Sequence, residues 1–233
     1  IEFFGISGTQ AIAGSMFKNN TVLNLIVNNN IDLVNLQMPA APENDTLNIT
    51  GAVSFKGNNR ALNTYSAAAP SLGMLTLKSN FGSAARIADI SNSNTNTGNT
   101  ITGNVTVERY ISYGKKWHLL SVPTNASSTQ TINAAWQEGN APMANSKPGY
   151  GTLISNNTTG NGYDFASTTV AFKKLVNNTW VNVGVSGTNT AINSADAYML
   201  YIRGDRSVGA GAPAGPTTLR TTGDIKMNNI SKA

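Results

Sequence analysis

The feature that most constrains this fold is a short alternation of apolar and polar residues that recurs along the first half of the chain. It is found as TVLNLIV at residues 21–27, TLNIT at 46–50, MLTLK at 74–78 and TITGNV at 100–105. The spacings of 24, 28 and 26 residues are measured between Leu23, Leu47, Leu75 and Ile101. Alternation with period two is typical of a strand with one buried face. Strands that return about every two dozen residues predict stacked coils that share a core.

The segments between these phrases are rich in Asn and Gly, as at residues 28–30, 57–59 and 91–99. Both residue types tolerate the left-handed backbone conformations that the corners of a coil require. We therefore predict that residues 1–107 form a stacked β-solenoid, similar to a parallel β-helix. An open sandwich of the same short strands is the alternative.

The second half of the chain has a different composition, because it holds all three tryptophans and most of the tyrosines. Short strand-like runs separated by Gly, Asn and Pro predict an antiparallel β-sandwich over residues 108–233. One short helix is expected at 132–138, capped by Thr129 or Thr131 and ended by Gly139. The fold class expected for the whole chain is therefore all-β, in two domains.

Composition points to an extracellular protein that hydrates its surface with amides and hydroxyls. Only 12% of the residues are charged, 40% are hydrophobic, and there is no cysteine. The absence of cysteine excludes disulfides and thiolate metal sites. The net charge of +5 is spread along the sequence, so we expect no nucleic-acid partner. No apolar run approaches the ~20 residues that cross a bilayer, so we expect no membrane insertion.

Several motifs resemble a region of large secreted proteins from bacteria with the type IX secretion system. They are GNVTVERYI (103–111), KWHLLSVP (116–123), TINAAWQEG (131–139), PGYG (148–151), YMLYIRGDR (198–206) and TTLRTTG (217–223). Upstream, GTQAI (8–12) and NLIVNN (24–29) are similar to the repetitive passenger that precedes that region. The resemblance implies an adhesin-like cell-surface protein and supplies no catalytic residues. We expect the chain to be an internal piece that lacks the family's C-terminal sorting domain.

Candidate catalytic and metal-binding residues are few. His118 is the only histidine, and a catalytic triad or a metal site would need companions at suitable spacing. A glycosidase needs two facing carboxyl groups, and folding would have to bring together a pair such as Glu138 and Asp164. No cofactor and no metal centre are therefore expected, although a calcium ion held by loop carbonyls and scattered Asp residues is left open.

A set of charged residues stands out in this charge-poor half of the chain. Glu108, Arg109, Arg203 and Asp205 lie at expected strand ends, where arginine–carboxylate pairs can lock the backbone. We interpret them as structural ion pairs, with a ligand clamp as the functional alternative. The tripeptide 203–205 also spells an integrin-binding motif, but Gly-Asp after a strand is a normal turn.

Exposed aromatic residues are the candidates for ligand binding. Trp180, Tyr150 and Tyr163 are predicted to form a sugar-stacking surface, whereas Trp117 and Trp136 are assigned to the core because tryptophan buries a large apolar area. Thr46, in Asp45-Thr46-Leu47, fits a short pattern for O-glycosylation in such secreted proteins.

These observations predict a non-enzymatic, secreted or cell-surface protein that acts in adhesion or as self-assembling structural material. Its expected partners are identical copies, neighbouring domains of the parent chain, or surface glycans. The alternatives are a carbohydrate-binding module and, third, a polysaccharide hydrolase.

Overall fold

The computed structural model describes residues 1–4, 10–28, 34–36, 46–64, 74–90, 98–125, 130–158, 160–183, 187–207 and 214–225. The protein is mostly β, as predicted, and divides into two compact units. We call residues 1–108 with 222–225 the coil unit, and residues 109–221 the sheet unit. Both boundaries fall inside strands, because β12 (Asn104–Ile111) and β20 (Thr217–Ile225) each contribute to both units.

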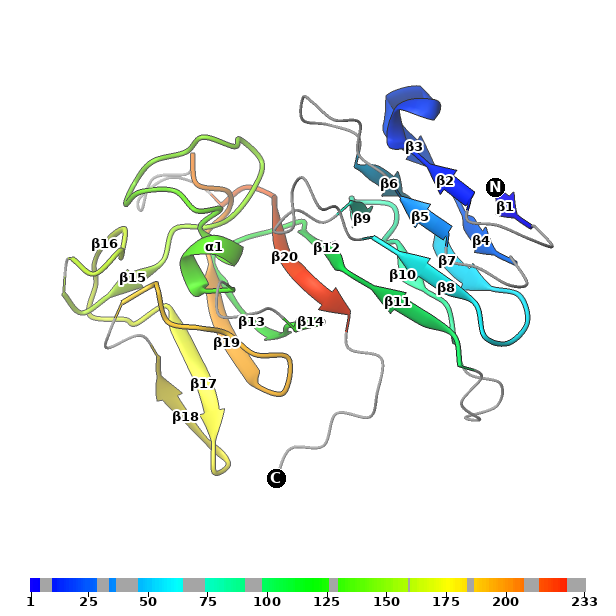
Figure 1. Ribbon diagram of the computed structural model, residues 1–233. Helices are drawn as coiled ribbons and strands as arrows, with labels where there is room; N and C mark the ends of the chain where they lie inside the picture. The colour runs from blue at the N-terminus through cyan, green and yellow to red at the C-terminus, as the bar shows by residue number, and fades with distance from the viewer. Residues whose placement is uncertain are drawn as a thin grey trace. The chain divides into compact units, whose positions relative to one another are not determined.

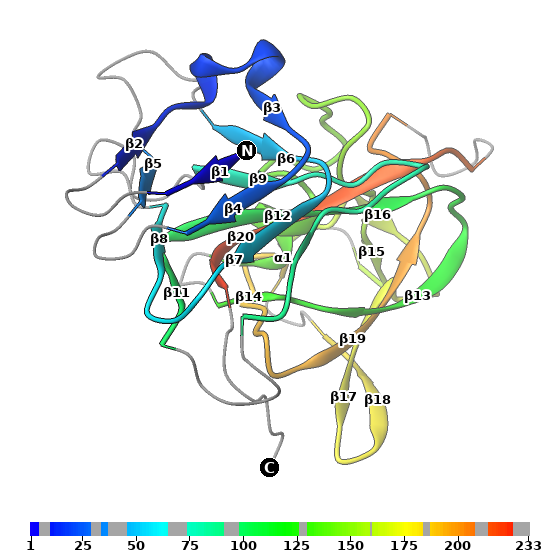
Figure 2. The ribbon, with the colours of Figure 1, turned by 90° about the vertical axis from the view of Figure 1, so that its right-hand side faces the viewer.

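The coil unit is built from three ladders in which each strand pairs in parallel with the third strand after it (Figure 1). The first ladder contains β1 (Glu2–Phe3), β4 (Leu25–Val27), β7 (Ala52–Phe55) and β10 (Arg86–Ile87). The second contains β2 (Gln10–Ile12), β5 (Val34–Leu36), β8 (Ala61–Asn63) and β11 (Thr100–Thr102). The third contains β3 (Thr21–Val22), β6 (Leu47–Ile49), β9 (Leu75–Leu77) and β12. Figure 2 shows the three ladders on different sides of this unit.

The interior of the coil unit is aliphatic and in register. Leu47 pairs with Leu75, which in turn pairs with Val105, and none of the three is exposed to solvent. Burying one such side chain stabilises the fold by about 1.5–3 kcal/mol. Parallel pairing therefore assembles this core from strands that are far apart in the sequence.

The recurring phrases align only in part. The two at 46–50 and 74–78 pair residue for residue, but those at 21–27 and 100–105 each span a corner and supply strands to two ladders. Asparagine side chains also link segments of this unit that are far apart in the sequence, by accepting hydrogen bonds from backbone N–H groups. Asn24 Oδ1 accepts from Ala52 N at 2.8 Å, and Asn99 Oδ1 accepts from Arg60 N at 2.8 Å. The short 3₁₀ segments η1 (Gly14–Met16) and η2 (Lys18–Asn20) connect β2 to β3.

The sheet unit is organised around a four-stranded antiparallel sheet. Its order is β13 (Lys116–Ser121), β19 (Ala197–Ile202), β17 (Phe172–Val176) and β18 (Thr179–Asn182). The shorter strands are β14 (Thr124–Asn125), which lies beside β20, and the parallel pair β15 (Ser155–Asn156) and β16 (Phe165–Ala166). The two-sheet sandwich predicted for this half stays a prediction.

Helix α1 (Ile132–Trp136) covers the buried side of this sheet. It begins where predicted, because Thr131 Oγ1 accepts from Ala134 N at 3.1 Å. The helix delivers Trp136, which is 2% exposed, to an aromatic core with ring centroids 5.2 Å from Phe172 and 5.8 Å from Tyr198. The prediction that Trp136 is a core residue is confirmed.

Candidate functional site

The strongest candidate for a binding surface is the outer face of the four-stranded sheet. Alternation places Phe172, Tyr198 and Leu200 on the buried side, so their neighbours along the strands point outward. Register then brings the outward residues together, since Trp117 pairs with Tyr201 and Leu175 pairs with Trp180. We call this set the aromatic face, and its members are Trp117, Leu119, Leu175, Trp180, Met199 and Tyr201.

The aromatic face is apolar but open to solvent. Leu119 is 66% exposed, and Trp117, Trp180 and Tyr201 are half-buried. The rings of Trp117 and Tyr201 meet edge to face, with centroids 5.5 Å apart and planes at 67°, an arrangement that aromatic pairs prefer. Contiguous exposed apolar surface of this kind commonly marks a binding site.

Cationic side chains lie against these rings. Lys173 Nζ sits 5.4 Å from the centre of the Trp117 ring, and the Arg203 guanidinium 4.7 Å from that of Tyr201. Arg203 also lies 5.0 Å from the Phe165 ring. These distances are within the range of a cation–π contact.

Arg203 is a buried cation whose nearest neighbours are rings. It is 8% exposed, its Nη2 donates to Ser155 Oγ at 3.4 Å, and its Nη1 has no hydrogen-bond partner among the described residues. Burial lowers the pKa of Arg203 because it removes water from the charged form. The ring faces therefore replace part of the lost hydration.

Only one of the three predicted ligand-binding aromatics lies on this face. Trp180 does, but Tyr163 is 3% exposed and its hydroxyl donates to Val183 O at 3.3 Å. Burial raises the pKa of Tyr163. Tyr150 is half-buried and packs against the Arg220 guanidinium, 4.3 Å from its ring centre. The prediction that Trp180, Tyr150 and Tyr163 form one surface is therefore wrong, because Tyr163 belongs to the core.

The prediction for Trp117 is wrong in the opposite direction. This side chain was assigned to the core, yet it lies half-buried on the outer face beside Tyr201. Alternation along β13 already places Trp117 and the exposed Leu119 on one side of the strand. What the sequence could not supply was the pairing with β19, where Tyr201 lies 84 residues after Trp117 and adds the second aromatic ring.

The predicted structural ion pairs are corrected by the observed contacts. Glu108 does form an ion pair, but its partner is Lys78 at 2.6 Å, within the coil unit. Arg109 and Arg203 have no carboxylate partner within the described ranges. Asp205 is a backbone cap, since it accepts from Gly149 N at 2.5 Å and from Ser207 N at 3.1 Å. The tripeptide 203–205 is buried and is not displayed as a recognition loop.

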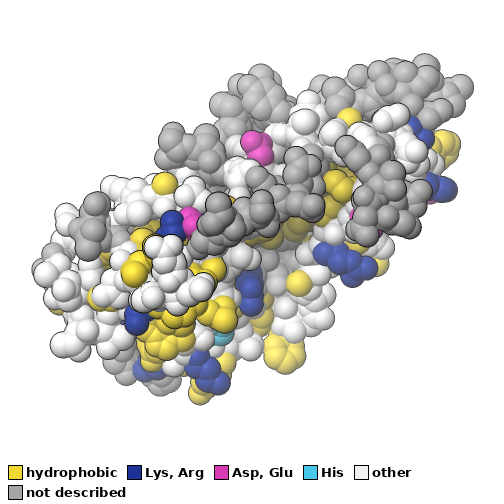
Figure 3. All heavy atoms as spheres, turned by 90° about the horizontal axis from the view of Figure 1, so that it is seen from below, with side chains coloured by type: hydrophobic (Ala, Val, Ile, Leu, Met, Phe, Trp, Pro, Cys, Tyr) yellow, Lys and Arg dark blue, Asp and Glu magenta, His cyan; other side chains and the backbone are white. Residues whose placement is uncertain are grey.

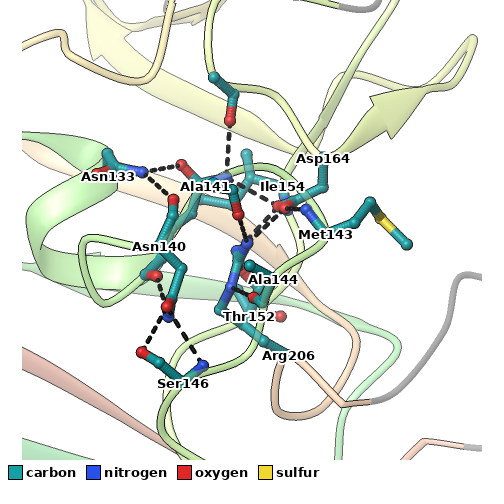
Figure 4. A network of polar contacts seen from close by, with 12 residues as sticks. Asn133, Asn140, Ala141, Met143, Ala144, Ser146, Thr152, Ile154, Asp164 and Arg206 are labelled. Atoms are coloured by element: carbon teal, nitrogen blue, oxygen red, sulfur yellow. Dashed lines mark hydrogen bonds and ion pairs between the residues drawn. The ribbon is translucent and has the colours of Figure 1, made fainter.

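The central ion pair of the sheet unit joins Asp164 and Arg206, both fully buried (Figure 4). The Asp164 carboxylate receives Arg206 Nη2 at 2.6 Å and Nη1 at 3.0 Å. It also accepts from Met143 N, Ile154 N and Gln137 Nε2. The remaining arginine N–H groups donate to the carbonyls of Ala141, Ala144 and Thr152. This complete set of bonds is what a buried ion pair requires.

The candidate hydrolase carboxyls, Glu138 and Asp164, are thus both held by arginine, because Arg220 Nε donates to Glu138 at 3.1 Å. His118 is half-buried, and its Nε2 has no hydrogen-bond partner in the described part of the chain. Burial, then the charges of Arg109 and Lys116, lower the pKa of His118. No group of three His, Asp or Glu that could hold a metal occurs among the described residues.

Thr46 is half-buried and lies just before β6, while Asp45 is outside the described residues. Its O-glycosylation stays a prediction. None of the helices in the described ranges is long and apolar enough to cross a membrane.

Comparison with protein-family models, with curated proteins and with solved structures found no match. The geometry above is therefore the basis for a functional proposal.

Proposed function

We propose that this chain is part of a non-enzymatic, extracellular surface protein, in which a β-solenoid carries a domain that binds polysaccharide through the aromatic face. The observation that carries the proposal is the open apolar sheet face formed by Trp117, Tyr201, Trp180 and Leu119. Flat apolar faces of sugar rings pack on such side chains, and aromatic residues are enriched where proteins bind partners.

The coil unit supports the scaffold part of this proposal. Its three ladders, in which each strand pairs in parallel with the third strand after it, support a solenoid, a fold in which each repeat stacks on its neighbours. Its first coil presents β1, β2 and β3, the terminal strands of their ladders among the described residues. Strand edges of this kind pair readily with other strands, which favours self-assembly as a second function.

The carboxyl groups argue against the hydrolase alternative. A general acid or nucleophile must face a substrate, but Asp164 is fully buried against Arg206, and the Glu138 side chain is 3% exposed beside Arg220. These groups serve the fold of the sheet unit.

Binding to an array of immobilised polysaccharides, followed by titration of the best binder, tests the principal function. Trp117→Ala and Trp180→Ala should each weaken binding at least about tenfold, the scale of a buried aromatic contact in an interface. The matched control is Phe81→Ala, which removes an 84% exposed ring from the coil unit. Equal affinities in all three variants, or no binding to any polysaccharide, would overturn the proposal.

Light scattering across a concentration series tests the second function. Growth in mass with concentration, together with filaments in negative-stain electron microscopy, supports assembly through the open strand edges. A constant monomeric mass contradicts it.

A further inference from the structure

The net positive charge of this chain comes from one segment. Residues 109–221 contain nine Lys and Arg against four Asp and Glu, whereas the rest of the chain contains seven of each kind. The net charge of +5 therefore belongs entirely to residues 109–221. Such an asymmetry between two parts of a chain points to an acidic partner for the basic part.

The carboxylates of the sheet unit are all engaged within it. Asp164 pairs with Arg206, Asp196 pairs with Lys174, and Glu138 pairs with both Arg220 and Lys147. Asp205 caps backbone N–H groups. The cations without a carboxylate partner, over the described ranges, are Arg109, Lys115, Lys116, Lys173 and Arg203.

Strand pairing places Lys173 and Arg203 beside the aromatic face, and it places Lys116 on the other side of β13. Lys116 pairs with the buried Ile202, whereas Trp117 pairs with the outward Tyr201. Lys173 pairs with Met199 and lies over Trp117. Lys116 lies over the Tyr113 ring at 5.6 Å, and Tyr113 is 62% exposed. On the face shown in Figure 3, hydrophobic side chains gather with Lys and Arg side chains at their border.

Arg203 strengthens the field at this end of the face. A desolvated guanidinium without a counter-ion interacts with an external anion more strongly than a hydrated one, because less water screens it. Lys173, which is half-buried and lies over the Trp117 ring, is the second cation on this face.

We infer that the ligand of the aromatic face is an acidic polysaccharide, whose carboxylate groups bind Lys173 beside the buried Arg203 while its sugar rings pack on the apolar side chains. This inference rests on the proposed polysaccharide binding and adds the chemical class of the ligand. The complementary charges give specificity for acidic over neutral chains.

Single-stranded nucleic acid is the competing anionic polymer, because its binders also combine cations with aromatic rings on which bases stack. The experiments below therefore include it.

A matched pair of polymers provides the test. Polygalacturonate and its fully methyl-esterified form have the same sugar backbone and differ in charge. Titration calorimetry of the full chain should give about two- to fivefold tighter binding of the acid, the scale of one exposed ion pair. The preference should shrink as salt is raised, because salt screens exposed charges.

Replacing a single charge tests which side chain binds the carboxylate groups of the polymer. Lys173→Gln should weaken polygalacturonate binding about two- to fivefold and leave binding of the ester unchanged. Lys18→Gln, an exposed lysine of the coil unit, is the matched control and should change neither. Thermal unfolding of each variant confirms that it is folded.

The outcomes separate the two proposals. Equal affinity for acid and ester, with loss of both in Trp180→Ala, overturns the acidic preference and keeps polysaccharide binding. Binding of neither polymer, nor of any polysaccharide on the array, overturns both. Tighter binding of oligo(dT) than of polygalacturonate, weakened in Lys173→Gln and in Trp180→Ala, identifies the face as a nucleic-acid site and overturns the inference.

Discussion

The coil unit and the sheet unit bury their hydrophobic cores in different ways. The coil unit repeats one contact, so that Leu47, Leu75 and Val105 stack in register and asparagines link segments that are far apart in the sequence. The sheet unit relies on contacts that occur once, above all the Asp164–Arg206 pair. The coil unit contains five Lys and Arg against seven Asp and Glu, whereas the sheet unit contains nine against four. The unique contacts of the sheet unit engage its carboxylates, so its unpaired charges are cations.

The largest effect should come from breaking the unique ion pair. Asp164→Asn leaves Arg206 buried without its counter-charge, which costs about 3–5 kcal/mol. Urea unfolding should show this loss in the sheet unit. The control Asp224→Asn, at an exposed position, should change stability by less than about 0.5 kcal/mol. A loss below about 1 kcal/mol for Asp164→Asn would show that this pair is not central to the unit.

The next largest loss of stability should come from a cavity in the coil unit. Leu75→Ala removes a fully buried side chain between Leu47 and Val105, at a cost of about 2–5 kcal/mol. Hydrogen exchange should show faster opening in the neighbouring coils and unchanged protection in β17 and β19. The exposed Leu23→Ala is the control. Uniform loss of protection in both units would contradict the separate cores.

A corner substitution should have an intermediate effect. At Gly51 a Cβ atom would lie 2.5 Å from Asn24 Oδ1 and 2.7 Å from Leu23 O, so Gly51→Ala must push the two coils apart. We expect a loss of about 1–3 kcal/mol by thermal or urea unfolding. At Gly82 the nearest atom to an added Cβ is 3.7 Å away, so Gly82→Ala should be nearly neutral. Similar losses at both positions would show that the corner contact does not matter.

The smallest effect concerns pH. His118 has a pKa below its ordinary value of 6.5 because of burial and of the neighbouring Arg109 and Lys116 charges. The unfolded chain therefore takes up the proton first as pH falls, and stability should decrease below about pH 6.5 until the folded protein is protonated. The melting temperature of His118→Gln should vary less than that of the wild type between pH 7 and 5. Parallel profiles for the two proteins would contradict this role.

Local patterns were sufficient for much of the fold. Period-two alternation placed the strands of the coils, and Thr131 marked the start of α1. Alternation also put Trp117 and Leu119 on one side of β13. The phrases at 21–27 and 100–105 were misaligned because each turns a corner, where the alternation continues although the chain changes ladder.

The candidate site was harder to predict because it depends on long-range pairing. Trp117 was assigned to the core on the general tendency of tryptophan to be buried, and only its pairing with Tyr201 reveals an outer face. The error for Tyr163 is the reverse. It was expected to be exposed, but it is buried and its hydroxyl donates to Val183 O. The carboxylate partners of the arginines could not be predicted either, because Asp164 and Arg206 lie 42 residues apart in the sequence.

The most direct test of the account uses the three tryptophans of the chain as reporters. In a ¹⁵N–¹H NMR spectrum, the indole N–H signals of Trp117, Trp136 and Trp180 can be followed while polygalacturonate is added. The account predicts that the signals of Trp117 and Trp180 shift with saturation, whereas that of the buried Trp136 stays in place. Saturable binding that leaves Trp117 and Trp180 unmoved would place the ligand elsewhere and contradict the account.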